Sequence, residues 1–233
     1  MIVTKLKSLE EIYDMIKPYS NVLIAGCDGC CQPPRGIHEA NNLGKMLKLK
    51  KMVDGEKFDY KATTVLRQCD DKIAATALRS LVDDYDAIIS MACGIGVQIL
   101  TKVFPEKLTF PAQNTMFNGA ADHEKNSYVE YCNQCGDCLL GITGGICPVA
   151  GCAKSLMNGP CGGQIDGKCE VGDYKIDCAW VNIYKRLKKL GRLDLFEKYR
   201  PKRDYRLMTS PSFIDFLELD EIEEEINEKE AKA

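Results

Sequence analysis

Eight of the chain's thirteen cysteines lie between Cys132 and Cys178. This segment opens with Cys132-Asn-Gln-Cys135-Gly-Asp-Cys138, in which two consecutive two-residue gaps bring three thiols onto one loop. Cysteine-ligated iron–sulfur clusters use this spacing together with a later cysteine that precedes a proline. Cys147-Pro148 supplies such a cysteine, although it follows after eight intervening residues. The spacing therefore predicts a metal cluster, in a fold other than the one in which the motif is usual.

The other cysteines of this segment sit among glycine, proline and asparagine, with few apolar residues to form a core. Metal binding would then supply much of the folding free energy, as it does in other small metallo-domains. Eight cysteines are enough for two four-ligand sites, and the alternatives are zinc or disulfides. We predict a cysteine-rich metal module over residues 126–206 with the ligands Cys132, Cys135, Cys138, Cys147, Cys152, Cys161, Cys169 and Cys178.

The first residues, Met1-Ile-Val-Thr-Lys-Leu-Lys-Ser, carry neither the apolar stretch nor the cleavage site of a signal peptide. We therefore expect a cytoplasmic protein, where reducing conditions favour metal ligation over disulfides. The most apolar stretch, 87–103, is interrupted by glycines and Gln98, so we expect no membrane insertion.

The first 125 residues have a different pattern, in which short apolar runs alternate with helical segments. Ser8-Leu-Glu-Glu11 is typical of a helix start. Alternation of strands and helices predicts an α/β fold with a parallel, doubly wound sheet. The expected strands are 21–26, 63–66, 87–91 and 108–110, and the expected later helices are 37–52, 70–82 and 95–104.

Five further cysteines follow these predicted strands. The carboxyl ends of parallel strands share one edge, where open α/β folds bind their ligands. We therefore predict a second metal site formed by Cys27, Cys30, Cys69 and Cys93, with Cys31 outside it. The alternatives are cysteines that are simply buried in the core, or a weakly indicated phosphate site at the glycine-rich turn 93–96. His38 and His123 lie in no catalytic motif, so we expect no catalytic residue.

Charge is distributed unevenly along the chain. Residues 213–233 hold nine acidic residues and two lysines, a net charge of −7 in a chain of net charge −3. We expect residues 207–233 to form a separate acidic tail. The preceding stretch, 185–206, contains ten lysines and arginines and predicts a solvated helix face or a docking surface for an acidic electron carrier such as a ferredoxin. It has no base-reading motif, so we expect no nucleic acid partner.

Several glycine-punctuated motifs then occur in order: Cys147-Pro-Val-Ala-Gly-Cys, Asn158-Gly-Pro-Cys-Gly-Gly163, Gly167-Lys-Cys-Glu-Val171, Asp177-Cys-Ala-Trp180 and the basic run from Tyr184. They resemble the C-terminal module associated with methylenetetrahydrofolate reductases. Residues 20–206 as a whole are similar to the iron–sulfur (MetV-type) small subunit of the two-subunit form of that enzyme.

The resemblance implies an electron-transfer subunit that is not catalytic alone. Its partner would be a flavin-containing TIM-barrel subunit that reduces methylenetetrahydrofolate to methyltetrahydrofolate. We expect two 4Fe-4S clusters, with a third cluster or a zinc ion at one site as alternatives. Two other functions stay open: a zinc-stapled scaffold subunit without electron transfer, and an independent α/β domain that binds a nucleotide or a corrinoid.

Overall fold

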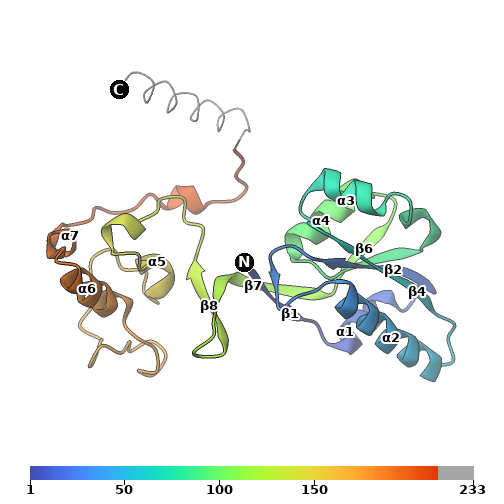
Figure 1. Cartoon of the computed structure of the whole chain (residues 1–233), viewed down its shortest axis with the longest axis horizontal. Helices are drawn as coiled ribbons and strands as arrows, with labels where there is room; N and C mark the ends of the chain where they lie inside the picture. Colours follow the sequence, from blue (N-terminus) through green and yellow to red (C-terminus); the bar gives the residue numbers. More distant parts are fainter. Residues whose placement is uncertain (215–233) are drawn as a thin grey trace, which may run out of the picture. The chain divides into compact units, whose positions relative to one another are not determined.

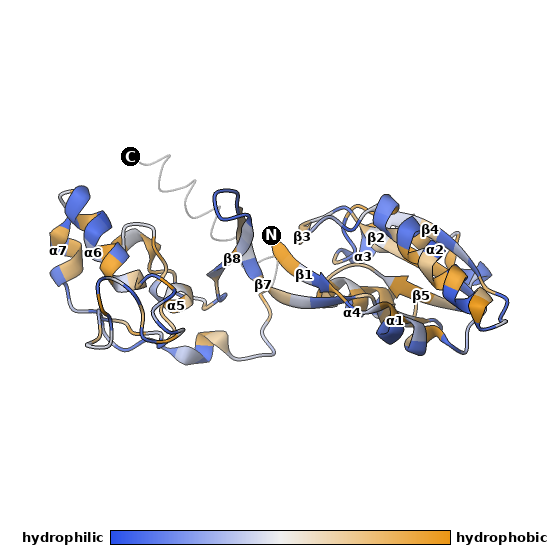
Figure 2. Ribbon diagram, turned by 90° about the horizontal axis from the view of Figure 1, so that it is seen from below, coloured by the Kyte–Doolittle hydropathy of each residue, from blue (hydrophilic) through white to orange (hydrophobic). Residues whose placement is uncertain are grey.

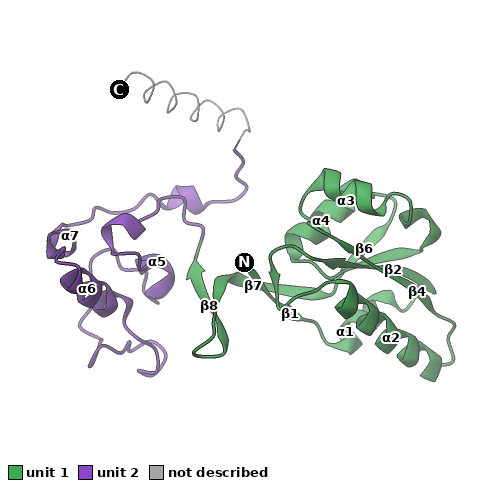
Figure 3. Ribbon diagram, viewed as in Figure 1, with its two compact units in different colours: residues 1–133 green, residues 134–233 purple. Residues whose placement is uncertain are grey.

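The computed structural model describes residues 1–214. It separates into two compact units, residues 1–133 (unit 1) and residues from 134 onward (unit 2), shown in Figure 3. The acidic tail predicted for 207–233 lies mostly outside the described residues. Among the described helices, none is both long and apolar enough to cross a membrane.

Four parallel strands form the central sheet of unit 1. The apolar run at its centre, β2, pairs with β4 on one side and with β5 on the other, in the order β4-β2-β5-β6. Except for Asn21 at its start, every residue of β2 is buried, because both of its faces are covered. The predicted parallel sheet is confirmed, and its strands are β2 (Asn21–Cys27), β4 (Asp59–Val65), β5 (Ala87–Ser90) and β6 (Leu108–Pro111).

Helices cover both faces of this sheet (Figure 1). Ser8 and Asp70 cap two of them, since their side chains accept from the N–H groups of Glu11 and Ile73. Two helices bury Ile12, Leu43 and their neighbours on one face, and two bury Leu78 and Leu100 on the other. The helices are α1 (Leu9–Ile16) and α2 (Ile37–Val53), then α3 (Asp71–Leu78) and α4 (Gly94–Val103), with the short three-ten helix η1 (Val82–Asp84).

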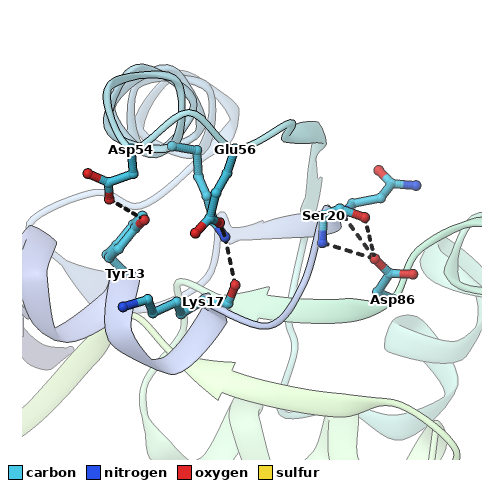
Figure 4. A network of polar contacts seen from close by, with 8 residues as sticks. Tyr13, Lys17, Ser20, Asp54, Glu56 and Asp86 are labelled. Carbon is cyan, nitrogen blue, oxygen red and sulfur yellow. Dashed lines mark hydrogen bonds and ion pairs between the residues drawn. The ribbon is translucent and has the colours of Figure 1, made fainter.

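Polar contacts join α1 to the end of α2 at the rim of this layer (Figure 4). The Tyr13 hydroxyl donates to Asp54, and the buried Lys51 ammonium donates to the Lys17 carbonyl oxygen at 2.7 Å and pairs with Glu56. Asp86 accepts from the N–H of Ser20 at 3.2 Å. A lysine buried to 1% exposure is tolerated because each of its contacts is an acceptor.

A second, mixed sheet in unit 1 was not predicted. Its strand order is β3-β1-β7-β8, and the first strand of the chain pairs in parallel with a two-residue strand in the loop after β2. This pairing matches Ile2 with Cys31, so it fixes the position of a cysteine. The strands are β1 (Ile2–Leu6), β3 (Cys31–Gln32), β7 (Gln113–Asp122) and β8 (Ser127–Cys132).

Unit 2 is dominated by loops, and its apolar core is small. That core consists of Cys178, Trp180, Ile183 and Leu187, packed by Phe196, whose ring centroid lies 6.2 Å from that of Trp180. One side of α6 is apolar and the other is hydrophilic (Figure 2). The helices are η2 (Leu140–Ile142), α5 (Pro148–Gly151), α6 (Ala179–Lys189), α7 (Leu193–Glu197) and η3 (Tyr205–Met208).

Candidate functional site

The carboxyl ends of β2 and β5 form the point where the strand order of the parallel sheet reverses. The chain passes from β2 outward to β4 on one side and then returns to β5 on the other. Connections leave such a point in opposite directions, which opens the crevice where doubly wound folds bind ligands. Cys27 is the last residue of β2, and Cys93 precedes α4 directly after β5. The sheet therefore places these two cysteines at its ligand-binding edge.

Three buried cysteines lie together at this edge. Cys27, Cys31 and Cys93 pack against each other with Ala92, and Ile2 of β1 packs on them. We call these three cysteines the thiol triad. Cys31 belongs to it because β3 pairs with β1, whereas the sequence analysis had left this residue outside the site.

Hydrogen bonding within the triad shifts the pKa of each thiol. The pKa of Cys27 is lowered to about 6, first by hydrogen bonding to Cys31 and then by the backbone N–H groups of Gln68 and Gly29, against desolvation, which raises it. Bonding to Cys31 likewise lowers the pKa of Cys93 to about 5. The same two contacts raise the pKa of Cys31, which favours this thiol as the hydrogen-bond donor to Cys27 and Cys93. Thiolates are the form of cysteine that binds metals.

The other two cysteines predicted for this site lie at the surface. Cys30 is exposed, and its carbonyl oxygen accepts from the N–H of Ile2 at 3.0 Å. Cys69 is also exposed, and the pKa of its thiol is raised, first by desolvation and then by the charges of Cys27, Cys93 and Cys30. Cys69 is therefore close enough to Cys27 and Cys93 for their charges to affect its pKa. Cys30 is not a member of the triad.

A buried glutamine holds the two strand ends around the triad. The Gln68 amide nitrogen Nε2 donates to the carbonyl oxygens of Ala25 at 2.9 Å and Gly26 at 2.8 Å. Ser90 of β5 donates its hydroxyl to Gln68 Oε1 at 2.6 Å. Gln68 is completely buried, so it satisfies polar groups that water does not reach. The sequence analysis missed this residue, which adjoins Cys69.

Replacing Gln68 with alanine is expected to lower the free energy of unfolding by about 2 to 4 kcal/mol, because two carbonyl oxygens and a hydroxyl would each lose one buried hydrogen bond. Urea denaturation followed by circular dichroism measures the change. The exposed neighbour Arg67, replaced with alanine, is the matched control and should change stability by less than about 0.5 kcal/mol. Equal stabilities of the two variants would contradict the bracing role of Gln68.

The cysteines of unit 2 fall into separate surroundings. Cys178 is buried in the apolar core, and Cys152 packs on that core from the end of α5. Cys147 precedes α5, and its sulfur accepts from the N–H of Ala150 at 3.4 Å. The two glycine-rich loop residues Cys161 and Cys169 are both half-buried.

A lysine lies beside the loop cysteines of unit 2. The Lys154 ammonium is 3.9 Å from the sulfur of Cys161 and pairs with the Glu170 carboxylate. The pKa of Lys154 is raised, first by its hydrogen bond to Glu170 and then by the charges of Cys161, Glu170 and Cys169. Lys154 thus places a positive charge near two of the predicted ligands.

The predicted three-cysteine run crosses the boundary between the units. Cys132 ends β8 in unit 1, while Cys135 and Cys138 lie in unit 2. Arg203 braces the second part of the run, since its Nη2 donates to the carbonyl oxygens of Cys135 at 2.8 Å and Asp137 at 2.9 Å. Cys138 is exposed and Cys135 is half-buried, so the loop presents thiols on its surface.

Within residues 1–214, the histidine, cysteine, aspartate and glutamate side chains form no group of three or more that could hold a metal ion. That finding concerns one ion, whereas an iron–sulfur cluster places its thiolates around several iron atoms. The triad suits a cluster in its donor chemistry, with soft sulfur donors, burial and two lowered pKa values. Binding would release the proton of Cys31, because metal ligands must be deprotonated.

The fold and these cysteines define a class of protein: a doubly wound α/β unit with a buried thiol triad at its ligand-binding edge, joined to a cysteine-rich unit. Residues 110–206 match the family described as "Methylene-tetrahydrofolate reductase C terminal". The match covers the predicted ligands from Cys132 to Cys178 and leaves the thiol triad outside it. It associates this part of the chain with methylenetetrahydrofolate reductase. No curated protein and no solved structure matches the chain.

Proposed function

We propose that this chain is the iron–sulfur electron-transfer subunit of a methylenetetrahydrofolate reductase. Its cysteines would hold the clusters, and it would pass electrons to a flavin-containing catalytic subunit that reduces methylenetetrahydrofolate to methyltetrahydrofolate. Iron–sulfur clusters supply transfer of single electrons at low potential. The proposal rests on the thiol triad at the point where the strand order of the parallel sheet reverses. Residues 110–206 of the same chain match a reductase-associated family.

In unit 1, Cys27, Cys31 and Cys93 would be ligands, and Cys69 is the fourth candidate because its thiol responds to the charges of the triad. Each residue of the triad is at most 6% exposed, and solvent exposure is one of the properties that set a cluster's potential. The backbone N–H groups of Gln68 and Gly29 would stabilise negative charge on the Cys27 sulfur. We infer that these residues position and tune the site without taking part in the reduction of the folate.

In unit 2, the predicted ligands are those from Cys135 to Cys178, together with Cys132. Their loops contain little apolar core, so bound metal would stabilise them. The exposed basic side of α6, with Lys185, Arg186, Lys188 and Lys189, suits the docking of an acidic electron carrier. Such docking would weaken as salt rises, because exposed charges are screened within about 8 Å at physiological ionic strength.

Anaerobic purification of the full chain tests the proposal. We expect a brown protein that contains iron and acid-labile sulfide and has a broad visible absorption that bleaches on reduction with dithionite. Mixed with the flavin-containing catalytic subunit, the reduced protein should bleach the flavin absorption. A colourless protein that contains only zinc would favour the scaffold function instead. A brown protein that leaves the flavin oxidised would refute the role as its electron donor.

A further inference from the structure

Unit 2 contains a cavity of about 250 Å³ beside its apolar core, and Leu195 both lines the cavity and packs against that core. Apolar side chains form part of its wall, and basic side chains from one short segment form the rest. The lining comprises Asp137, Leu139, Ile142, Met157, Leu195, Lys198, Tyr199, Arg200, Pro201, Lys202 and Arg203.

The first buried cation of this wall, Arg200, is 4% exposed. Its Nη2 donates to the carbonyl oxygens of Leu195 at 2.9 Å and Ile142 at 3.3 Å, and its guanidinium lies 5.0 Å from the centre of the Trp180 ring. Within the described residues its buried Nε has no hydrogen-bond partner. Desolvation lowers the pKa of Arg200, as expected for a cation that lacks a facing carboxylate.

The second buried cation, Arg203, has a side chain with no exposed surface. Its Nη2 is satisfied by the loop carbonyl oxygens of Cys135 and Asp137, but its buried Nε and Nη1 have no hydrogen-bond partner within residues 1–214. The Asp137 carboxylate lies 3.9 Å from Nη2, which is beyond hydrogen-bond distance.

Two buried guanidiniums with three unused donor atoms are costly to fold, because each buried charge loses several kcal/mol of hydration unless it is paired. Two exposed lysines, Lys198 and Lys202, add positive charge to the same wall, and Asp137 is its one acidic residue. The lining therefore has a net positive charge, and its one carboxylate, Asp137, lies 3.9 Å from Arg203. Guanidinium groups pair well with carboxylate and phosphate oxygens.

We infer that this cavity binds a small organic anion, a carboxylate or a phosphate attached to an apolar or aromatic group. The charged end would lie beside the exposed ammonium groups of Lys198 and Lys202, close to the positive charges of the buried Arg200 and Arg203. The apolar end would contact Leu139, Ile142 and Met157. The volume is just below the range of roughly 300 to 1,000 Å³ for ordinary ligand pockets, which limits the ligand to a small molecule.

Trp180 provides the measurement, since it is the only tryptophan of the chain and stacks against Arg200. Benzoate is the anionic probe, inorganic phosphate is the second anion, and benzamide is the uncharged analogue. We expect benzoate or phosphate to change the tryptophan fluorescence of the full chain with saturation in the millimolar range and to raise the melting temperature. Benzamide should do neither.

Variants then locate the site. Replacing both Lys198 and Lys202 with glutamine should weaken anion binding about 3- to 10-fold without unfolding the protein, because both side chains are exposed. The matched control replaces Lys188 and Lys189, which are exposed on α6 outside the cavity, and should leave the affinity unchanged. Arg200→Lys should weaken binding more than about 10-fold, since lysine has no planar pair of donors.

Four results would overturn the inference. The first is no saturable response to benzoate or phosphate, and the second is an equal response to benzamide. The third is an equal loss of affinity in the control variant, which would indicate attraction to general positive charge. Displacement of bound benzoate by a peptide of residues 215–233 would show that the chain's own acidic segment occupies the cavity, and this too would refute a site for a small molecule.

Discussion

Replacing Cys31 with serine is expected to abolish metal binding by unit 1, whereas replacing its neighbour Cys30 should leave that binding intact. Cys31 is buried in contact with Cys27 and Cys93, and Cys30 is exposed. A serine oxygen is a poor substitute for a soft thiolate ligand. Mutating a residue that only hydrogen-bonds to a metal ligand lowers metal affinity roughly 10- to 100-fold. Loss of the ligand Cys31 itself should lower the affinity by more than this.

Iron analysis and the visible absorption of the anaerobic variants measure this difference. The adjacent pair is well matched, because both substitutions change one sulfur atom to oxygen in the same loop. Circular dichroism checks that both variants stay folded. Loss of iron from Cys30→Ser with full iron in Cys31→Ser would restore the ligand set predicted from the sequence. Cys69→Ser should behave like Cys31→Ser if Cys69 is the fourth ligand.

Replacing Cys135 with serine is expected to remove one cluster from the protein and, with it, the electron transfer that depends on that cluster. Arg203 holds the carbonyl oxygens of Cys135 and Asp137, so the loop should keep its course when the sulfur is lost. The variant therefore tests the loss of the sulfur ligand without a change in the course of the loop. We expect the reduction of the flavin-containing partner to fall at least about 100-fold.

Gln134→Asn is the control within the same loop. Gln134 has a backbone φ of 51°, a left-handed conformation that asparagine adopts more readily than most residues. This control should therefore keep both its fold and its iron. Full iron content and full electron transfer in Cys135→Ser would show that the three-cysteine run holds no essential cluster.

Much of unit 1 could be predicted from local patterns. The apolar run of β2 and the capping side chains of Ser8 and Asp70 lie close to the elements that they define, and those elements begin where they were predicted, although α3 ends at Leu78 and not at residue 82. The edge at which cysteines gather also followed from the order of strands and helices. These features depend on contacts between near neighbours in sequence, which residue spacing reveals.

The members of the thiol triad could not be predicted in the same way. Cys30 and Cys31 are adjacent, and only the pairing of β3 with β1 determines which of the two faces the interior. That pairing joins Cys31 to Ile2, and neither strand has a strong local pattern, since β3 has two residues. The role of Gln68 depends in the same way on carbonyl oxygens from β2 and a hydroxyl from β5.

The sequence by itself determined that this chain has an α/β half, a cysteine-rich half and an uneven distribution of charge, because hydrophobic period, cysteine spacing and charge are properties of neighbouring residues. The tertiary structure alone decided which thiols are buried together and which buried cations have no carboxylate within hydrogen-bond distance. Arg200 and Arg203 belong to the basic stretch 185–206, whose sequence predicts a solvated face or a docking surface, yet both side chains are buried. Burial and pairing are set by contacts between distant segments, and those contacts exist only in the folded chain.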